Sequence, residues 1–292
     1  MKLGLGTVQF GMRYGVSNQR GMPGPDEVSR ILKLAQQSGI STIDTATLYG
    51  SSEEVLGSSL SPGSRFSIVT KTPQGKSPDE LQAAFMASLK KLKQDKIYGL
   101  LIHDPKDLLR TGSEKLVEKL WELRAQNRVE RIGFSAYRAD QIAEITARFK
   151  GLNLIQVPLN YFDQRLLRDG TLRELKELGY EIHVRSAFLQ GILLMEPSAL
   201  GAHFDSVRKH LGECQTLLKN AGLNPLEGAL AFLASIKEID RVIIGVTSED
   251  ELRQVVAAWK AVSAKQTPIE FKSLAWSDET ILDPSLWKFP QP

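Results

Sequence analysis

The stretch of sequence that decides the fold reads TIDTATLYGSSEEVLGSSL, residues 42–60. It opens with the β-branched run Thr42–Thr45, which is typical of a buried strand. It ends in Ser52–Leu60, where apolar residues recur at helical spacing among polar ones. A strand followed closely by a helix is the repeating half of a βαβ unit, so we expect the same alternation in the rest of the chain.

The alternation continues through eight strands and their helices, with no internal break in composition. Strands are predicted at Lys2–Gly6, Thr42–Thr45, Ser67–Lys71, Ile97–His103, Arg131–Ser135, Leu154–Pro158, Glu181–Ser186 and Arg241–Val246. Helices are predicted at about Asp26–Ser38, Ser52–Leu60, Pro78–Leu92, Ser113–Asn127, Ala139–Phe149, Gly170–Leu178, Asp205–Ile236 in two pieces, and Glu249–Ala261. Eight such pairs favour a closed parallel (β/α)8 barrel of the α/β class over an open doubly wound sheet.

We expect residues 1–292 to form a single barrel domain, with residues 265–292 as a C-terminal tail packed on the barrel. The first turn lacks the G-x-G-x-x-G pattern of a Rossmann domain. Loops that follow strands lie on the C-terminal face of a barrel, where active sites are built, so Gly11–Gly24 and Leu189–Phe204 are candidate walls of a pocket. Aromatic candidates for its lining, with core packing as the alternative, are Phe10, Tyr14, Tyr161, Phe162, Trp276 and Trp287.

Composition argues against several classes of function. The 37 Lys and Arg residues are scattered against 34 Asp and Glu, so nucleic acid is not an expected partner. No window approaches the roughly 18 to 20 apolar residues of a membrane span, and the first residues lack a secretory signal, so we expect a cytoplasmic protein that does not bind membranes. Cys214 has no disulfide partner, and His183, His203 and His210 have no metal-binding spacing, so no metal is implied.

Four polar residues fall at or just beyond the ends of three consecutive predicted strands: Asp44, Tyr49, Lys71 and His103. These strand ends converge in a barrel, so the four side chains can meet around one reacting atom. A tyrosine with a pKa near 10 is a poor acid until a cation such as Lys71 stabilises its phenolate, and Asp44 can hold that ammonium. Each residue alone has an ordinary explanation at a strand end or helix start, but together they form a device for proton transfer.

These motifs resemble the Asp, Tyr, Lys, His tetrad of the aldo-keto reductases. The resemblance extends to GLGTVQFG at 4–11, DTAxxYG at 44–50, SExxLG at 52–57 and QVPLN at 156–160. It implies a barrel that binds a nicotinamide dinucleotide across its C-terminal face without a Rossmann domain. It also implies hydride transfer to the carbonyl of a small molecule, with Tyr49 protonating the oxygen and His103 orienting it.

The resemblance carries over to the cofactor contacts less uniformly. Ser135 matches the serine that contacts the nicotinamide carboxamide, and Gln156 matches its usual partner, but Ala136 stands where relatives commonly have Asn. Many relatives place an aromatic residue at the end of strand seven, whereas this chain has Arg185 followed by Ser186. An arginine plane can stack on a ring or pair with phosphate. The complete set of predicted cofactor contacts is Gly6, Thr7, Ser135, Gln156, Arg185, Ser186, Gly245, Thr247, Ser248 and Gln254.

The choice between NADP and NAD depends on residues 245–254, which read GVTSEDELRQ. The resemblance implies NADP, whose 2′-phosphate Thr247, Ser248 and the helix amides could bind. The acids at 249–251 oppose a phosphate, although they also favour the dipole of a first helical turn, and Arg253 is the nearby cation in this segment. We therefore expect NADP, with NAD as a usable second cofactor and a preference below about 100-fold, or 2.7 kcal/mol.

Two other functions remain open from the sequence. The first is a catalytically weak barrel of the same family that senses the cofactor or regulates a partner, since a fold does not guarantee its chemistry. The tetrad argues against it, because a binding protein needs no proton donor with an activating lysine. The second is a cofactor-free isomerase or lyase, which lacks the paired carboxylates or the Schiff-base lysine that it would need. The oligomeric state and the substrate cannot be read from the sequence.

Overall fold

The strands of the protein close into a barrel, as the alternation predicts. The computed structural model describes residues 1–61, 63–264 and 268–287. All neighbouring strands are parallel, and β1 pairs with both β2 and β8, which closes the sheet in sequence order. The strands are β1 Leu3–Gly6, β2 Thr42–Asp44, β3 Ser67–Lys71, β4 Ile97–Ile102, β5 Val129–Ser135, β6 Leu154–Pro158, β7 Glu181–Arg185 and β8 Arg241–Gly245.

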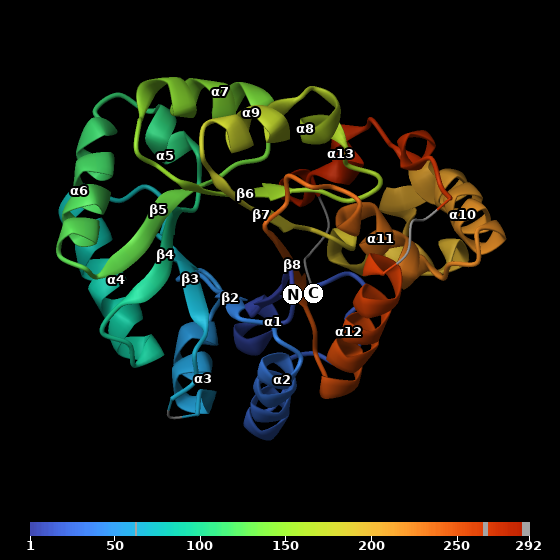
Figure 1. Ribbon diagram of the computed structural model, residues 1–292, viewed down its shortest axis with the longest axis horizontal. Helices are drawn as coiled ribbons and strands as arrows, with labels where there is room; N and C mark the ends of the chain where they lie inside the picture. The colour runs from blue at the N-terminus through green and yellow to red at the C-terminus, as the bar shows by residue number, and fades with distance from the viewer. Residues whose placement is uncertain (62, 265–267, 288–292) are drawn as a thin grey trace.

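Helices surround the strands in a ring, which Figure 1 shows from the end of the barrel. Their apolar faces pack against the strands, and one continuous core of buried side chains joins the two layers. The described α-helices are α1 Val8–Gly11, α2 Pro25–Gln37, α3 Ser52–Ser59, α4 Pro78–Leu92, α5 Lys106–Leu109, α6 Glu114–Ala125, α7 Ala139–Arg148, α8 Arg165–Arg168, α9 Thr171–Glu177, α10 Asp205–Asn220, α11 Pro225–Ala234, α12 Glu249–Ser263 and α13 Glu279–Leu282.

The long helical region 205–236 is broken into α10 and α11, as its sequence predicts. Gly222 adopts a positive φ of 75° directly after α10, a conformation that glycine accepts without steric cost. Asn224 then caps α11, because its side chain accepts from the Glu227 backbone while the Glu227 side chain accepts from the Asn224 backbone. Pro225 occupies the first turn, where a missing N–H costs nothing.

Strand β5 starts two residues earlier than predicted, at Val129. The reason is tertiary, since Val129 pairs with Ile97 at the start of β4 and extends the ladder. Four short helices were not predicted, α1, α5, α8 and α13, because a single turn carries no measurable hydrophobic period. Neither difference changes which residues lie at the carboxyl ends of the strands.

Residues 268–287 pack beside α8 and α10, where Glu279 accepts from Arg165 and the carbonyl of Leu274 lies 3.1 Å from His210 Nε2. The backbone N–H of Trp276 donates to the carbonyl of Phe162 at 2.9 Å, and the side-chain amide of Gln164 donates to the carbonyl of Phe271 at 2.7 Å. Trp287 is buried against Phe204. Residues 265–267 and 288–292 of the predicted tail lie outside the described residues. Within the described chain, no helix is both long and apolar enough to cross a membrane.

Candidate active site

The carboxyl ends of β2, β3 and β4 bring the four predicted catalytic residues together. Asp44 and Lys71 are the last residues of β2 and β3, and His103 directly follows β4. Tyr49 comes from the loop between β2 and α3. The parallel register sets Asp44 level with Gly6 on one side and with Val69 on the other, so Lys71 stands two residues further along its strand.

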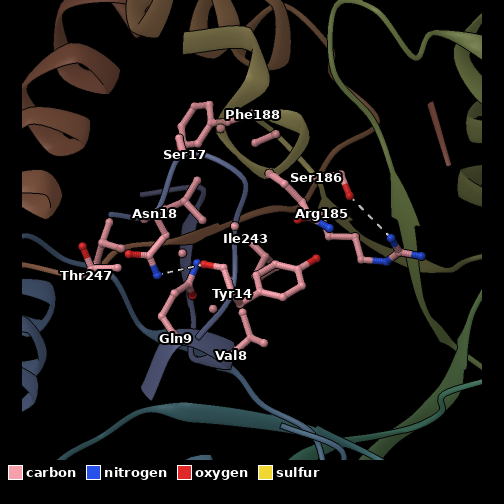
Figure 2. A pocket seen from close by; sticks show the side chains of 18 of the residues that line it. Val8, Gln9, Tyr14, Ser17, Asn18, Arg185, Ser186, Phe188, Ile243 and Thr247 are labelled. Atoms are coloured by element: carbon pink, nitrogen blue, oxygen red, sulfur yellow. Dashed lines mark hydrogen bonds between the residues drawn. The ribbon is translucent and has the colours of Figure 1, made fainter. Parts of the chain in front are cut away.

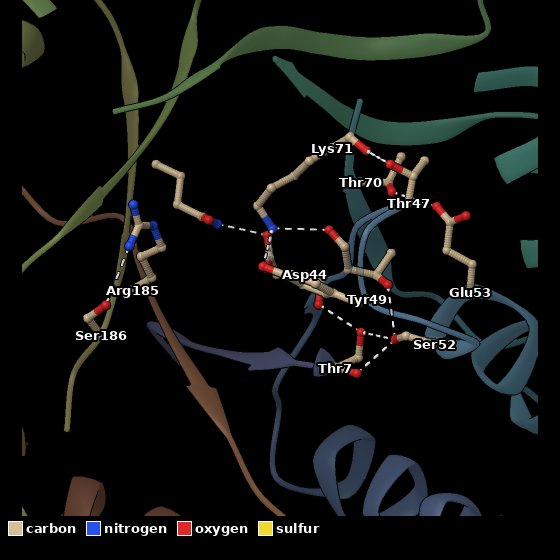
Figure 3. Close-up of polar contacts among 12 residues, drawn as sticks. Thr7, Asp44, Thr47, Tyr49, Ser52, Glu53, Thr70, Lys71, Arg185 and Ser186 are labelled. Carbon is tan, nitrogen blue, oxygen red and sulfur yellow. Dashed lines mark hydrogen bonds and ion pairs between the residues drawn. The ribbon is translucent and has the colours of Figure 1, made fainter. Parts of the chain in front are cut away.

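Lys71 occupies the centre of this group, and its side chain is only 1% exposed (Figure 3). Its ammonium donates to Asp44 Oδ2 at 2.6 Å, to the carbonyl of Thr45 at 3.0 Å and to the hydroxyl of Tyr49 at 3.3 Å. Burial lowers the pKa of Lys71, and the Asp44 carboxylate opposes that shift. The buried Lys71 ammonium thus pairs with the buried Asp44 carboxylate and donates a hydrogen bond to the Tyr49 hydroxyl.

Gln156 holds the other side of Asp44. Its Nε2 donates to Asp44 Oδ1 at 2.7 Å, so the two carboxylate oxygens serve different donors. Gln156 is fully buried on β6, level with Ser135 on β5. Its Oε1 has no hydrogen-bond partner within the described chain, which leaves an acceptor free beside Ser135. The sequence placed Gln156 against the cofactor, and the structure adds a second contact, the orientation of Asp44.

The loop that carries Tyr49 is fixed by a buried hydroxyl network. Ser52 Oγ donates to the carbonyl of Thr7 at 2.7 Å, and Thr7 Oγ1 donates to the carbonyl of Asp44 at 3.0 Å. Gly50 has a φ of 57°, and a Cβ there would lie 2.2 Å from the carbonyl oxygen of Gly11. Only glycine fits this close crossing of two loops. The phenol is therefore positioned by strand β1 as well as by its own loop.

Tyr49 keeps its proton in this environment. Burial raises its pKa above the ordinary value, Asp44 adds to the rise, and Arg185 opposes it. The sequence led us to expect that Lys71 would lower this pKa, but burial outweighs the neighbouring cations. The phenol is therefore a hydrogen-bond donor at neutral pH.

His103 lies beside Tyr49 with its ring edge-on, at 6.0 Å between ring centroids. Burial, followed by the charges of Lys71 and Arg185, lowers its pKa to about 3. The imidazole is therefore neutral at physiological pH and carries one N–H. Its Nδ1 is buried and has no partner among the residues that the structure describes.

A cavity of about 690 Å³ extends from these residues to Thr247, beside the start of α12, and Figure 2 shows Tyr14, Arg185 and Thr247 among its lining residues. This volume lies within the range of small-molecule and cofactor sites, roughly 300 to 1,000 Å³. Both predicted wall segments contribute, Tyr14 and Asn18 from the first and Gln190 and Leu194 from the second. Of the predicted site residues, those that line the cavity are Gly6, Thr7, Asp44, Tyr49, His103, Ser135, Arg185, Ser186, Gly245, Thr247 and Gln254.

Three predicted site residues do not line the cavity. Lys71 and Gln156 lie one layer behind it, where each contacts Asp44. Ser248 is the N-cap of α12, and its hydroxyl accepts from the Glu251 backbone at 3.2 Å. The contact of Ser248 with the cofactor stays a prediction, and the structure shows that this hydroxyl also caps the helix.

Sequence reasoning missed several residues of the cavity wall. The Arg185 guanidinium stacks 4.0 Å above the ring of Tyr137, which lies two residues beyond the end of β5. Gln9 packs against Gly245 so closely that a Cβ on this glycine would lie 2.5 Å from the amide. The position of Tyr137 after a strand was a usable signal. Gln9 gave none, because it lies in the short helix α1.

Several aromatic residues and histidines have structural places instead. Phe10, Tyr161 and Phe162 are buried in the core, and Tyr14 lines the cavity. Two other candidates for the lining, Trp276 and Trp287, are not among the residues that line the cavity described above. The three other histidines bond to protein oxygens, as follows: His183 Nε2 to Glu181 Oε1 at 2.8 Å, His203 Nε2 to Thr280 O at 3.3 Å and His210 Nε2 to Leu274 O at 3.1 Å. Within the described ranges, no cluster of three potential metal ligands occurs.

The polar atoms around the cavity fit a polar ligand. The described chain has eight buried side-chain atoms without a partner, and four belong to residues that line the cavity or hold Asp44. They are Gln9 Oε1, His103 Nδ1, Gln156 Oε1 and Gln190 Oε1. Buried polar groups are ordinarily paired, so their concentration here indicates that a ligand with donor groups completes the site. A nicotinamide dinucleotide, with its carboxamide and ribose hydroxyls, has such groups.

Comparison with known proteins agrees with this geometry. Among solved structures the chain is similar to the holo form of an aldo-keto reductase from Bacillus halodurans, with a TM-score of 0.74 and 20% identity over 98% of this chain and 94% of that one. It is also similar to a Pseudomonas aeruginosa protein assigned to the aldo-keto reductases, with a TM-score of 0.67 and 22% identity over 89% and 90% of the two chains. No curated protein matches significantly. The model of the Aldo/keto reductase family matches residues 2–272, and this chain belongs to that family.

Proposed function

We propose that this protein reduces the carbonyl group of a small aldehyde or ketone to an alcohol with NADPH or NADH, and that Tyr49 donates the proton. The observation that carries the proposal is the contact of 3.3 Å between the Lys71 ammonium and the Tyr49 hydroxyl, at the wall of the cavity. When bound, the dinucleotide supplies the hydride. The residues of the protein position the substrate and stabilise the charge that develops on its oxygen.

The direction of the Lys71 contact determines where the proton of Tyr49 points. An ammonium has three donors and no acceptor, and those of Lys71 go to Asp44, Thr45 and Tyr49. The Tyr49 oxygen therefore accepts from Lys71, and its own hydrogen is directed into the cavity. A carbonyl oxygen placed there would receive it.

The same contact favours the transfer. Burial and Asp44 keep Tyr49 protonated before the reaction, which a proton donor requires. As the proton leaves, negative charge appears on an oxygen that already faces the Lys71 ammonium. A preorganised cation in a site shielded from water stabilises such charge more than it would in water.

His103 acts as a neutral donor in this proposal. Because Nδ1 has no acceptor in the described part of the chain, we assign the hydrogen of the neutral ring to Nε2. From its place beside Tyr49 this N–H can hold the substrate oxygen while charge develops on it. A charged imidazolium is disfavoured here, because Lys71 and Arg185 already occupy the region.

The proposed cofactor contacts follow the cavity wall. Ser135 and the free Oε1 of Gln156 would bind the carboxamide, and Arg185 with Ser186 would lie beside the ring. The remaining proposed contacts are Gly6, Thr7, Gly245 and Gln254, whereas Thr247 lines the cavity but donates both of its hydrogens to Glu251. Ser248 is left out, since it caps α12.

The main competing function is a cofactor-sensing or regulatory barrel with little turnover. All three donors of the Lys71 ammonium are used, and one of them goes to the Tyr49 hydroxyl. This arrangement favours an enzyme, because a binding protein has no need of an activated proton donor. A cofactor-free isomerase or lyase is disfavoured for a different reason. Lys71 is tied to Asp44, so it is not the free amine that a Schiff base needs.

One experiment separates these functions. NADPH and NADH are titrated against the protein by calorimetry, and nicotinamide absorbance is then followed with a panel of aldehydes and ketones. We expect micromolar or tighter binding and turnover of at least one carbonyl. Binding without turnover across the panel would favour the sensor, and no binding of either dinucleotide would refute both cofactor-dependent functions.

A further inference from the structure

The cavity has a second end, at the start of α12. It extends from Tyr49 and His103 to Thr247, Glu251 and Gln254. In (β/α)8 barrels, loops after the seventh and eighth strands often bind phosphate together with a helix N-terminus, where free amides attract anions. An extended dinucleotide with its reactive ring at Tyr49 would thus place its adenosine half near Glu251. This step rests on the proposed function.

A protein carboxylate already occupies the polar groups at this end. The Thr247 N–H donates to Glu251 Oε2 at 2.6 Å, and the Thr247 hydroxyl lies 3.0 Å from each Glu251 oxygen. Thr247 is 8% exposed, so water offers little substitute for these bonds. Both hydrogens of Thr247 that a phosphate would need are therefore committed to Glu251.

A second carboxylate accepts from the amide of Glu249, the first residue of α12. The Glu249 N–H donates to Glu27 Oε1 at 2.6 Å, from the neighbouring helix α2. This donation, followed by a hydrogen bond from Arg30, holds the pKa of Glu27 below its usual range, so Glu27 is charged at neutral pH. The anion-binding position of α12 is filled from within the protein.

Two cations at this end, on α12 and α2, are paired with carboxylates, whereas Arg20 is an exposed cation that lines the same cavity, and its charge helps to lower the pKa of Glu27. Arg253 pairs with Glu249 at 2.5 Å and its side chain is 60% exposed. Arg30 pairs with Glu27, and its Nε lies 3.9 Å from Glu249. A 2′-phosphate beside Glu251 would therefore find no unpaired cation among the described residues at the start of α12, and Arg20 is the cation of the cavity wall that the repulsion from Glu251 must outweigh.

We propose that Glu251 makes this protein select NADH over NADPH, because its carboxylate accepts from the 2′- and 3′-hydroxyls of the adenosine ribose and repels a 2′-phosphate. A carboxylate has about four acceptor positions, and the bonds from Thr247 leave room on Oε1. The expected preference is the opposite of the NADP preference that the family resemblance implies. The family's fold and tetrad are retained, and the discrimination comes from this chain's own α12.

The test is the ratio of dissociation constants for NADPH and NADH, measured by calorimetry on the full chain without substrate. We expect the wild type to bind NADH at least about tenfold more tightly, a difference of about 1.4 kcal/mol. Glu251→Gln keeps the shape and removes the charge, so the ratio should move toward NADPH by at least about tenfold. Asp250→Asn is the matched control, since it removes an exposed charge from the same turn outside the cavity wall. This control should move the ratio by less than about threefold.

Tighter binding of NADPH by the wild type would overturn the inference and leave the proposed function intact. An unchanged ratio in a folded Glu251→Gln variant would also overturn it. Binding of neither dinucleotide would overturn the inference together with the proposed function. If Glu251→Gln fails to fold, Glu251→Ala removes the same charge with a smaller side chain and should shift the ratio in the same direction by at least about threefold. An unchanged ratio in that variant would likewise overturn the inference.

Discussion

The two ends of the cavity carry similar polar groups but use them differently. At the tetrad end, a chain of hydrogen bonds runs from Gln156 through Asp44 and Lys71 to Tyr49, which faces the cavity. At the α12 end, Thr247 donates both of its hydrogens to Glu251, so only acceptor positions on the Glu251 carboxylate remain for a ligand. A polar residue beside a cavity thus serves a ligand only where its own network leaves a donor or acceptor free.

Burial adds to this difference. Lys71 is 1% exposed and its charge acts on neighbours through a poorly screened environment, whereas Arg253 is 60% exposed at the other end. We therefore expect substitutions at the tetrad to change rates by orders of magnitude. Substitutions at the start of α12 should change cofactor choice or helix stability, with little effect on the chemical step.

The largest effect is expected for Tyr49→Phe. The variant keeps the ring but removes the proton donor, so kcat/KM should fall by roughly 10²- to 10⁴-fold. The dissociation constant for the dinucleotide should remain within about threefold of the wild-type value, since the ring and the Lys71 network stay in place. Steady-state kinetics and calorimetry measure the two quantities.

Tyr14→Phe is the matched control, because Tyr14 also lines the cavity and has no hydrogen bond to Lys71. Its kcat/KM should change by less than about tenfold. A Tyr49→Phe variant as active as the wild type would mean that another group supplies the proton.

Lys71→Met should lower kcat/KM by about 10²-fold and move the alkaline limb of the pH–rate profile to higher pH. The ammonium favours the phenolate, so its removal leaves Tyr49 protonated over a wider range. The value of kcat/KM at neutral pH checks the first expectation, and a pH–rate profile extended well above pH 10, the ordinary pKa of tyrosine, checks the second. An alkaline limb that stays in place would show that Lys71 and Tyr49 are not coupled.

Asp44→Asn should shift the alkaline limb in the opposite direction, with a loss of about tenfold in kcat/KM at neutral pH. Asp44 favours the charged form of Lys71, whose pKa burial already lowers, and it raises the pKa of Tyr49. Without this carboxylate both groups lose their protons at lower pH, so activity declines earlier as pH rises. A shift to higher pH in this variant would contradict the arrangement of charges described above.

The barrel and the tetrad can be predicted from the sequence because each depends on local pattern. A β-branched run followed by a helical period places Asp44 and Lys71 at strand ends, and closure of the barrel brings those ends together. The order of tetrad residues along the chain then agrees with their positions around the mouth. The tetrad can therefore be predicted without knowing which side chains pack against one another in the core.

The α12 end cannot be predicted in the same way, because its polar residues have competing partners. From the sequence, Ser248 is equally suited to a phosphate and to the cap of a helix. Only the fold brings Glu27 from α2 to the Glu249 amide, across 222 positions of sequence. The stacking of Arg185 on Tyr137 joins β7 to the loop after β5 and is equally invisible to local patterns.

The smallest effect is expected for Ser248→Ala, which tests whether the start of α12 is occupied by its own helix. Loss of the cap should lower the free energy of unfolding by about 1 kcal/mol. For a chain of this size, that is roughly 2–4 °C in melting temperature. The dissociation constant for NADH should stay within about twofold, because the hydroxyl accepts from Glu251 and does not line the cavity.

Asn224→Ala is the matched control, since it removes an equivalent cap from α11, where the side chain accepts from Glu227 at 2.9 Å. Both variants should lose similar stability and keep NADH binding. If Ser248→Ala alone weakens NADH binding more than about tenfold, this hydroxyl serves the ligand as well as the helix, and the contrast between the two ends of the cavity fails at that residue.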